Sequence, residues 1–377
     1  FVIQSEAKDP ENIHAICHRD SSSLRSSEWQ SNDRDMKKKT KKIILGSVLA
    51  CLLFGIAGAA HIYYYFFAQP FQITDTTYIY IDRDDDVDSV YHKIAEAGNP
   101  KQMHGFESLV RYQGYNIKTG RYAIKPTDNM RYLHRRLSMG YQTPVKLTIG
   151  SVRTLDRMAR NVSRQLMIDS TEVATLLNDT AYIRKLGYTQ QTLPALFIPN
   201  TYEVYWDMSA EDFMTRMQKE HKAYWNEKRM KQAEAIGLTP VEVATLASIV
   251  EEETANQAEK PMVAGLYINR LKKGMLLQAD PTVKFSLQEF GLKRILFKHL
   301  EVDSPYNTYK YAGLPPGPIR VPSYQGLESV LNYTKHNYLY MCAKEDFSGT
   351  HNFAVTSAQH AANARKYQQA LNRRGIR

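Results

Sequence analysis

The feature that most constrains this chain is an uninterrupted, mostly apolar run, IILGSVLACLLFGIAGAA, at residues 43–60. As a helix rising 1.5 Å per residue it would be about 27 Å long, close to the thickness of a bilayer's hydrocarbon core. The aromatic segment Tyr63–Phe67 follows at once and is typical of a membrane interface. The sequence therefore predicts a transmembrane helix over residues 43–67. A cleaved signal peptide is the rival interpretation, with residues 57–60 as a small-residue cleavage site, although the apolar run is longer than usual for one.

Basic residues lie on one side of this run only. Arg34 and five lysines between Lys37 and Lys42 precede it, and the next lysine or arginine is Arg83. The positive-inside rule therefore predicts that residues 1–42 are a cytoplasmic tail and that the remaining chain lies outside. Because Met36 followed by KKKTKK is typical of a natural start, residues 1–35 are either a misassigned start or a disordered tail. A short linker over residues 61–75 would keep the following domains close to the membrane.

The charge of the chain excludes few classes of partner. Its cysteines and histidines do not indicate a disulfide framework or a metal site. The net charge is +10 and is spread along the chain, so nucleic acid, anionic lipid and an acidic polymer all remain possible partners on charge alone. Cys17, Cys51 and Cys342 are far apart, with no CxxC pair, and the eleven histidines are scattered. We therefore predict neither a disulfide framework nor a metal site.

The segment after the apolar run alternates between strand and helix patterns. This rhythm is typical of an α+β fold and predicts one or two small modules over residues 72–150. Basic side chains on the helix at 127–140 are interpreted as a solvated face. The predicted strands are 76–82, 114–124 and 143–149, and the predicted helices are 88–98 and 127–140.

The remainder, residues 151–377, is predicted to be a mixed helical and β domain, with two loops that stand out. The loop at 196–212 carries Tyr202, Tyr205 and Trp206, which can stack on sugar rings or fill a core, and the spacing favours the core. The segment 304–323, SPYNTYKYAGLPPGPIRVPS, is rich in Pro, Gly and Tyr and is typical of a loop lining a binding cleft.

One helix of this domain ends in three consecutive carboxylates. Thr239 is a fitting N-cap, with Pro240 at the first helical position and Glu242 completing a capping box. At about 100° per residue, Glu252 is predicted to face water and Glu251 to lie among small residues. Glu253 falls between large apolar neighbours, Leu246 and Ile249.

A carboxyl group held against apolar surface and near like charges keeps its proton to higher pH, so it can act as a general acid. Cleavage of a glycosidic bond needs such an acid at the leaving oxygen. The alternative is a solvated acidic cluster that only aids solubility. The pattern alone leaves both interpretations of Glu253 open, although acids at a helix C-terminus oppose the helix dipole.

Four longer motifs, in this order, carry a resemblance to a known family: ASIVEEETA, INRLKKGMLLQADPTVKF, YNTYKYAGLPPGPI and YLYMCAKEDFSGTHNFAVT. Together with the single N-terminal apolar run, they resemble the YceG-like family of membrane-bound endolytic murein transglycosylases. The resemblance extends from about residue 43 to the C-terminus and is strongest over residues 240–356. It implies a LysM-like module at 72–150 and a YceG-like catalytic domain at 151–377.

The resemblance also implies an activity and site residues. The family's catalytic acid is the second glutamate of an E-x-E-T motif, which here is Glu253, and Glu252 stands where many relatives have lysine. The enzyme would be a lyase that cuts nascent peptidoglycan within the strand, with no cofactor, no metal and no nucleic-acid partner. It would reside in the bacterial inner membrane, with its catalytic domain in the periplasm and wall-synthesis proteins as partners. Its substrate-side residues would be Gln278, Asp280, Thr282, Asn307 and Tyr309.

The implied reaction leaves a 1,6-anhydro end on N-acetylmuramic acid and consumes no water. Glu253 would protonate the oxygen that links this sugar to the next N-acetylglucosamine, and the muramic 6-hydroxyl would then attack. Two alternatives remain. A hydrolase would need a second carboxylate, for which Asp280 is the candidate. A non-catalytic wall-binding scaffold would have no use for an acid at position 253.

Overall fold

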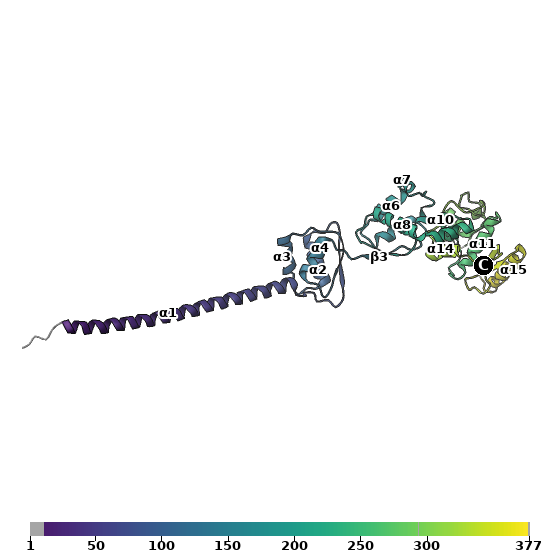
Figure 1. Cartoon of the computed structure of the whole chain (residues 1–377). Coiled ribbons are helices and arrows are strands. Elements are labelled where there is room, and N and C mark those ends of the chain that lie inside the picture. The colour runs from purple at the N-terminus through teal and green to yellow at the C-terminus, as the bar shows by residue number, and fades with distance from the viewer. Residues whose placement is uncertain (1–10, 293, 376–377) are drawn as a thin grey trace, which may run out of the picture. The chain divides into compact units, whose positions relative to one another are not determined.

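The computed structural model describes residues 11–292 and 294–375, beginning with one long helix (Figure 1). Helix α1 covers Glu11–Ile62 and continues as a π-helical turn, η1, over Tyr63–Phe67. Within the described residues, the stretch Asn32–Phe67 is the one helical segment that is by itself long and apolar enough to cross a membrane. This is compatible with the predicted anchor. Residues 11–35 are helical rather than disordered, and residues 1–10 of the predicted tail lie outside the described residues.

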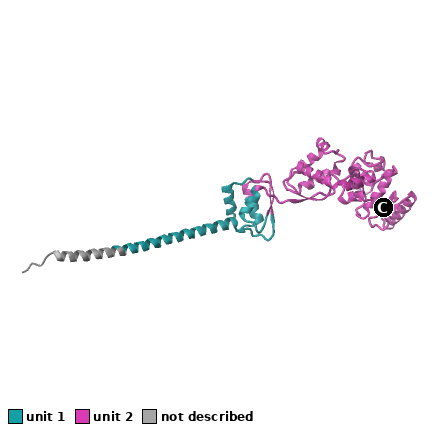
Figure 2. Ribbon diagram, viewed as in Figure 1, with its two compact units in different colours: residues 1–77, 91–116, 124–138 teal, residues 78–90, 117–123, 139–377 magenta. Residues whose placement is uncertain are grey.

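The described part of the first compact unit covers residues 11–77, 91–116 and 124–138, so helix α1 belongs to this unit (Figure 2). It holds most of α2 (Val87–Gly98) and of α4 (Met130–Met139), and all of α3 (His104–Gln113), which the sequence analysis had missed. The interior contains fully buried apolar side chains from each of these helices, Ile94, Phe106, Leu133 and Leu137.

The short linker predicted for residues 61–75 begins with the end of α1 and η1, and the segment after η1 is attached to this unit. Phe71 forms a β-bridge with Pro100, and the Lys101 amide donates a 2.9 Å hydrogen bond to the Pro70 carbonyl. On α3, a Cβ added at Gly105 would overlap the Tyr65 carbonyl oxygen, so only glycine allows η1 and α3 to approach so closely. The helix end and the unit are therefore packed together.

The second compact unit consists of residues 78–90, 117–123 and 139–377 (Figure 2). Strands β1 (Thr77–Ile81) and β2 (Gly120–Ile124) form one two-stranded sheet. A second, antiparallel sheet pairs β3 (Val145–Thr148) with β4 (Thr201–Val204), in the register Val145 to Val204. The prediction that 196–212 is a loop was therefore wrong for its centre, where alternate residues of β4 are buried. The LysM-like nature of residues 72–150 stays a prediction.

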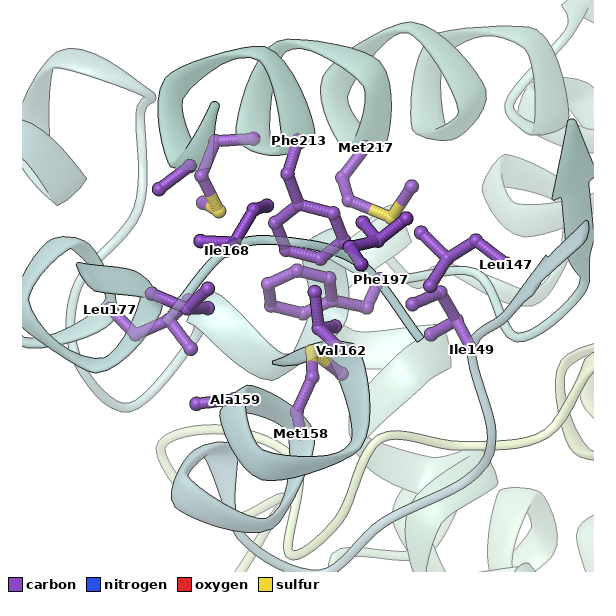
Figure 3. Close-up of a cluster of buried hydrophobic side chains, with 14 of the residues drawn as sticks. Leu147, Ile149, Met158, Ala159, Val162, Ile168, Leu177, Phe197, Phe213 and Met217 are labelled. Carbon is purple, nitrogen blue, oxygen red and sulfur yellow. The ribbon is translucent and has the colours of Figure 1, made fainter. Parts of the chain in front are cut away.

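A first core lies beside the β3–β4 sheet, under helices of which four begin at a side-chain cap, Thr154, Asp169, Asp179 or Ser209. The rings of Phe197 and Phe213 stack at its centre, with centroids 6.3 Å apart (Figure 3). Tyr202 is 5% exposed and Trp206 packs on the cluster, so the predicted core role holds for both, whereas Tyr205 is 55% exposed. The helical elements here are α5 (Leu155–Ser163), α6 (Ser170–Asn178), α7 (Thr180–Lys185), η2 (Leu193–Leu196) and α8 (Ala210–Tyr224).

A second core surrounds α10 (Pro240–Glu253), in which every residue from Val243 to Val250 is buried. It packs against α11 (Lys260–Lys272) and α14 (Tyr324–Leu331). The antiparallel hairpin of β5 (Tyr340–Ala343) and β6 (His351–Ala354) lies beside the last helix, α15 (Ser357–Arg373). The other helices are α9 (Glu227–Ile236), α12 (Asp280–Leu287) and α13 (Phe297–Leu300). Helices combined with three two-stranded sheets in the described residues agree with the predicted α+β class.

Candidate active site

Helix α10 presents the acidic cluster at its C-terminal end, and its start is as predicted. The Thr239 hydroxyl accepts a hydrogen bond from the Glu242 amide, and the Glu242 carboxylate accepts one from the Thr239 amide. This reciprocal capping box, with Pro240 at the first helical position, fixes where the helix begins. It ends where Thr254 adopts an extended conformation, so Glu251, Glu252 and Glu253 form its last three residues.

Two of the three glutamates are paired with basic side chains. Glu251 accepts from Lys260 at 2.8 Å and from the Ser323 hydroxyl. Glu252 accepts two bonds from Arg153, at 2.7 and 2.8 Å, and one from Arg320 at 2.6 Å. The prediction that Glu252 faces water was therefore wrong, since its side chain is only 15% exposed. The helical pattern could not reveal arginines that approach from distant parts of the chain.

Glu253 has a different environment. Its carboxylate accepts a 2.7 Å hydrogen bond from the neutral phenol of Tyr267, which is 2% exposed on α11. Among the described residues, no lysine, arginine or histidine lies within 4.0 Å of this carboxylate. Burial therefore raises the pKa of Glu253 to about 7 from 4.5, against the opposing effect of the Tyr267 hydrogen bond. The charge of Asp280 raises this pKa further, whereas Lys284 and Arg270 lower it.

The Glu253 side chain opens onto a pocket of about 220 Å³, lined mainly by polar groups. This is smaller than the roughly 300–1,000 Å³ of typical small-molecule sites. Three of the predicted substrate-side residues line it, namely Gln278, Asp280 and Tyr309. The other lining residues are Leu266, Tyr267, Arg270, Leu277, Met341, Cys342, Ala343 and His351.

Asp280 and Tyr309 are joined directly. The Tyr309 hydroxyl donates a 2.6 Å hydrogen bond to the Asp280 carboxylate, and burial together with this bond raises the pKa of Tyr309. Asp280 begins α12, where a carboxylate is favoured by the helix dipole. Gln278 precedes it with a φ of +51°, and its amide donates to the Thr308 carbonyl. The surrounding contacts hold Gln278 in this rare left-handed conformation, beside Glu253.

The other two predicted substrate-side residues lie beneath the pocket rather than on it. Thr282 is fully buried, and its hydroxyl binds the Ala279 carbonyl and the Thr308 hydroxyl. Asn307 is also fully buried, and its side-chain amide donates to two main-chain carbonyls of the preceding loop. Its Oδ1 accepts from the Tyr309 amide at 3.0 Å. The positions of these two residues give them a role in holding the loop that carries Tyr309.

Two pocket residues on α11 were missed by the sequence analysis. Tyr267 and Arg270 are three positions apart, so they lie on one face of the helix. Arg270 is 7% exposed, and its guanidinium donates to the carbonyls of Leu339 and Leu277. The signal was an i, i+3 pair of long polar side chains that follows the apolar segment Met262–Leu266, because buried polar groups need dedicated partners.

The chain is similar to known proteins in both sequence and structure. A model of the YceG-like family matches residues 79–366, well over half of the chain. An endolytic murein transglycosylase of Bacillus subtilis (strain 168) is 29% identical over 291 residues, which are 72% of this chain and 79% of that protein. One from Streptococcus pneumoniae is also 29% identical, over 66% of this chain, which spans about half (51%) of that protein's length. A crystal structure of a YceG-like protein from Listeria monocytogenes, 27% identical, superposes with a TM-score of 0.52 over 77% of this chain and 99% of that one.

Proposed function

Because this chain belongs to the YceG-like family, as its motifs had suggested, we propose that it is an endolytic peptidoglycan lytic transglycosylase. One observation carries the proposal. Of the three consecutive glutamates, only Glu253 lines the pocket and has no cationic partner among the described residues. Its pKa of about 7 leaves a large share of the Glu253 side chains protonated near neutral pH. A general acid works best when its pKa lies near the working pH.

In the proposed reaction Glu253 acts first as acid and then as base. Its proton moves to the glycosidic oxygen between N-acetylmuramic acid and N-acetylglucosamine as the bond from that oxygen to C1 breaks. The muramic 6-hydroxyl then bonds to C1 and returns its proton to the Glu253 carboxylate. The product is a 1,6-anhydro end, the enzyme regains its starting state, and water is neither consumed nor released.

Tyr267 and Asp280 act on Glu253 in opposite directions. The Tyr267 hydroxyl stabilises the carboxylate that forms once the proton has left, and the negative charge of Asp280 stabilises the protonated acid. Together with burial, these effects leave the pKa near 7, where both forms of the side chain are accessible during one turnover.

The proposed location follows from α1. Its apolar stretch would form a single-pass anchor in the bacterial inner membrane, with the basic flank in the cytoplasm and the catalytic domain in the periplasm. An enzyme held there would meet newly made glycan strands and the proteins that synthesise them. The module at 72–150 would be LysM-like.

The products of the reaction test this function. The full chain, in detergent micelles, would be incubated with purified peptidoglycan, and the new glycan ends would be identified by mass spectrometry. We expect internal cuts that carry 1,6-anhydro ends. Reducing ends instead would show a hydrolase and would make Asp280 the candidate second carboxylate. Binding of glycan without any cleavage would overturn the enzyme assignment and favour a wall-binding scaffold.

A further prediction concerns Tyr267. In Tyr267→Phe the pKa of Glu253 is expected to rise above its present value of about 7, because the hydrogen bond that lowers it is lost. Since the acid must carry its proton, the pH above which kcat/KM falls should move upward. The pH dependence of glycan release measures this, with Tyr311→Phe as control, since Tyr311 is exposed and bonds to Asp303 away from the pocket. A downward or absent shift would contradict the proposed influence of Tyr267 on Glu253.

A further inference from the structure

A histidine also lines the catalytic pocket, and a buried carboxylate holds it in place. His351, the first residue of β6, lies on the same pocket as Glu253. Its ring nitrogen Nδ1 lies 2.9 Å from Glu259 Oε2, and its main-chain amide donates a 2.6 Å hydrogen bond to Glu259 Oε1. Glu259 therefore binds the backbone and the ring of the same residue, which fixes both.

Glu259 is itself held in place by burial and hydrogen bonds. It is 8% exposed, and a third donor, the Thr254 hydroxyl, binds its Oε2 at 2.9 Å. Thr254 follows Glu253 directly, so this carboxylate connects the end of α10 to the strand that carries His351. Burying a carboxylate is costly unless its oxygens are well hydrogen bonded, and here three donors satisfy them.

The arrangement determines which ring nitrogen is available. Because a carboxylate oxygen accepts, the shared proton belongs to Nδ1, and the neutral ring then has an unprotonated Nε2 that can accept a hydrogen bond. A histidine oriented by a carboxylate in this way has a defined tautomer and a defined ring position. In that form of the ring, Nε2 is a hydrogen-bond acceptor for a ligand.

We propose that His351 is a second catalytic residue, which accepts a hydrogen bond from the attacking 6-hydroxyl of the muramyl sugar and holds it over C1. Glu259 is its positioning residue. This inference rests on the proposed function. While Glu253 still carries its own proton, the hydrogen of the 6-hydroxyl is directed to His351. Once Glu253 has protonated the leaving oxygen, that hydrogen passes to the Glu253 carboxylate as the 6-hydroxyl oxygen bonds to C1, so no further group has to enter the reaction. Orienting the internal hydroxyl gives it an advantage over water, because a correctly placed nucleophile reacts far faster than a free one.

The ratio of products tests this role without depending on the overall rate. Among new glycan ends made by the full chain in detergent micelles, the proportion with a reducing end reports attack by water. In His351→Ala and Glu259→Gln we expect this proportion to rise on the order of tenfold, the effect of losing one orienting hydrogen bond. His351→Gln, whose side-chain oxygen can still accept, should recover part of the 1,6-anhydro product. His92→Gln, an exposed histidine on α2, is the control and should match the unaltered chain.

The outcomes separate this inference from the proposed function. If the variants are slower but keep the original ratio of ends, Glu259 and His351 only support the hairpin and the inference is overturned. If His351→Ala shows no cleavage because it does not fold, the ratio in His351→Gln and Glu259→Gln decides. If the unaltered chain itself yields no 1,6-anhydro ends, the proposed function fails, and the inference fails with it.

Discussion

Replacing Glu253 by glutamine is expected to lower the rate of glycan cleavage by roughly 10²–10⁴-fold, the usual contribution of a general acid or base. Glutamine preserves the shape of the side chain and can still accept the Tyr267 hydrogen bond, but it has no proton to give to the leaving oxygen. The initial rate at which soluble glycan is released from peptidoglycan measures the loss. Glu234→Gln, an exposed change on α9, is the matched control and should leave the rate unchanged. Cleavage by Glu253→Gln at more than a tenth of the original rate would remove Glu253 from the mechanism.

The same substitution is expected to stabilise the protein at alkaline pH. The pKa of Glu253 is raised from 4.5 to about 7 on folding, so below pH 4.5 the group is protonated in both states and has no effect. Between pH 4.5 and 7 the folded state keeps a proton that the unfolded state loses, and the free energy of unfolding falls as the pH rises. Above pH 7 the full cost, about 3 kcal/mol, is present. Thermal unfolding should therefore show a higher Tm for Glu253→Gln at pH 8 and no difference at pH 4. An equal shift at both pH values would point to packing instead.

The second large effect is expected on stability at Lys260. This side chain is 1% exposed and donates to Glu251 at 2.8 Å, joining the start of α11 to the end of α10. Lys260→Met would leave the Glu251 carboxylate in the interior without its cation, which typically costs about 3–5 kcal/mol. Denaturant unfolding of the variant measures this loss.

A second change on the partner separates lost attraction from lost packing. Adding Glu251→Gln to Lys260→Met removes the unpaired charge, so the double variant should recover a large part of the lost stability. Lys231→Met is the control, because Lys231 forms a 2.7 Å pair with Glu227 in which both side chains are more than 70% exposed. Exposed pairs of this kind contribute little, and we expect almost no change. A double variant no more stable than Lys260→Met would assign the loss to packing of the lysine stem.

Local patterns in the sequence predicted the features that depend only on residues close together in the chain. The capping box at Thr239 and Glu242 and the choice of Glu253 as the carboxylate with the least polar surroundings both follow from positions on one helix. The partners of Glu252 do not, because Arg153 and Arg320 lie 99 and 68 positions away and meet it only in the folded chain. A helical pattern indicates which residues share one face of a helix, but not which distant residues pack against that face.

The cleft residues show the same limit. Motif similarity pointed to Gln278, Asp280 and Tyr309, which line the pocket. It could not distinguish them from Thr282 and Asn307, which are buried and support the loop from beneath. The buried side chains of Thr282 and Asn307 are held by main-chain carbonyls and by the Thr308 hydroxyl. These contacts are not visible in the order of residues.

The close packing of η1 against α3 has a consequence for how the enzyme finds its substrate. A flexible tether of about fifteen residues would let the attached module swing through roughly 20 Å. With Gly105 against the Tyr65 carbonyl and Phe71 bridged to Pro100, that freedom is lost at the helix end. If α1 spans the membrane as proposed, the first compact unit stays at a constant height above the lipid and turns only when the helix turns. The first unit then travels with its anchor, and lateral diffusion in the bilayer sets how fast it moves along the membrane.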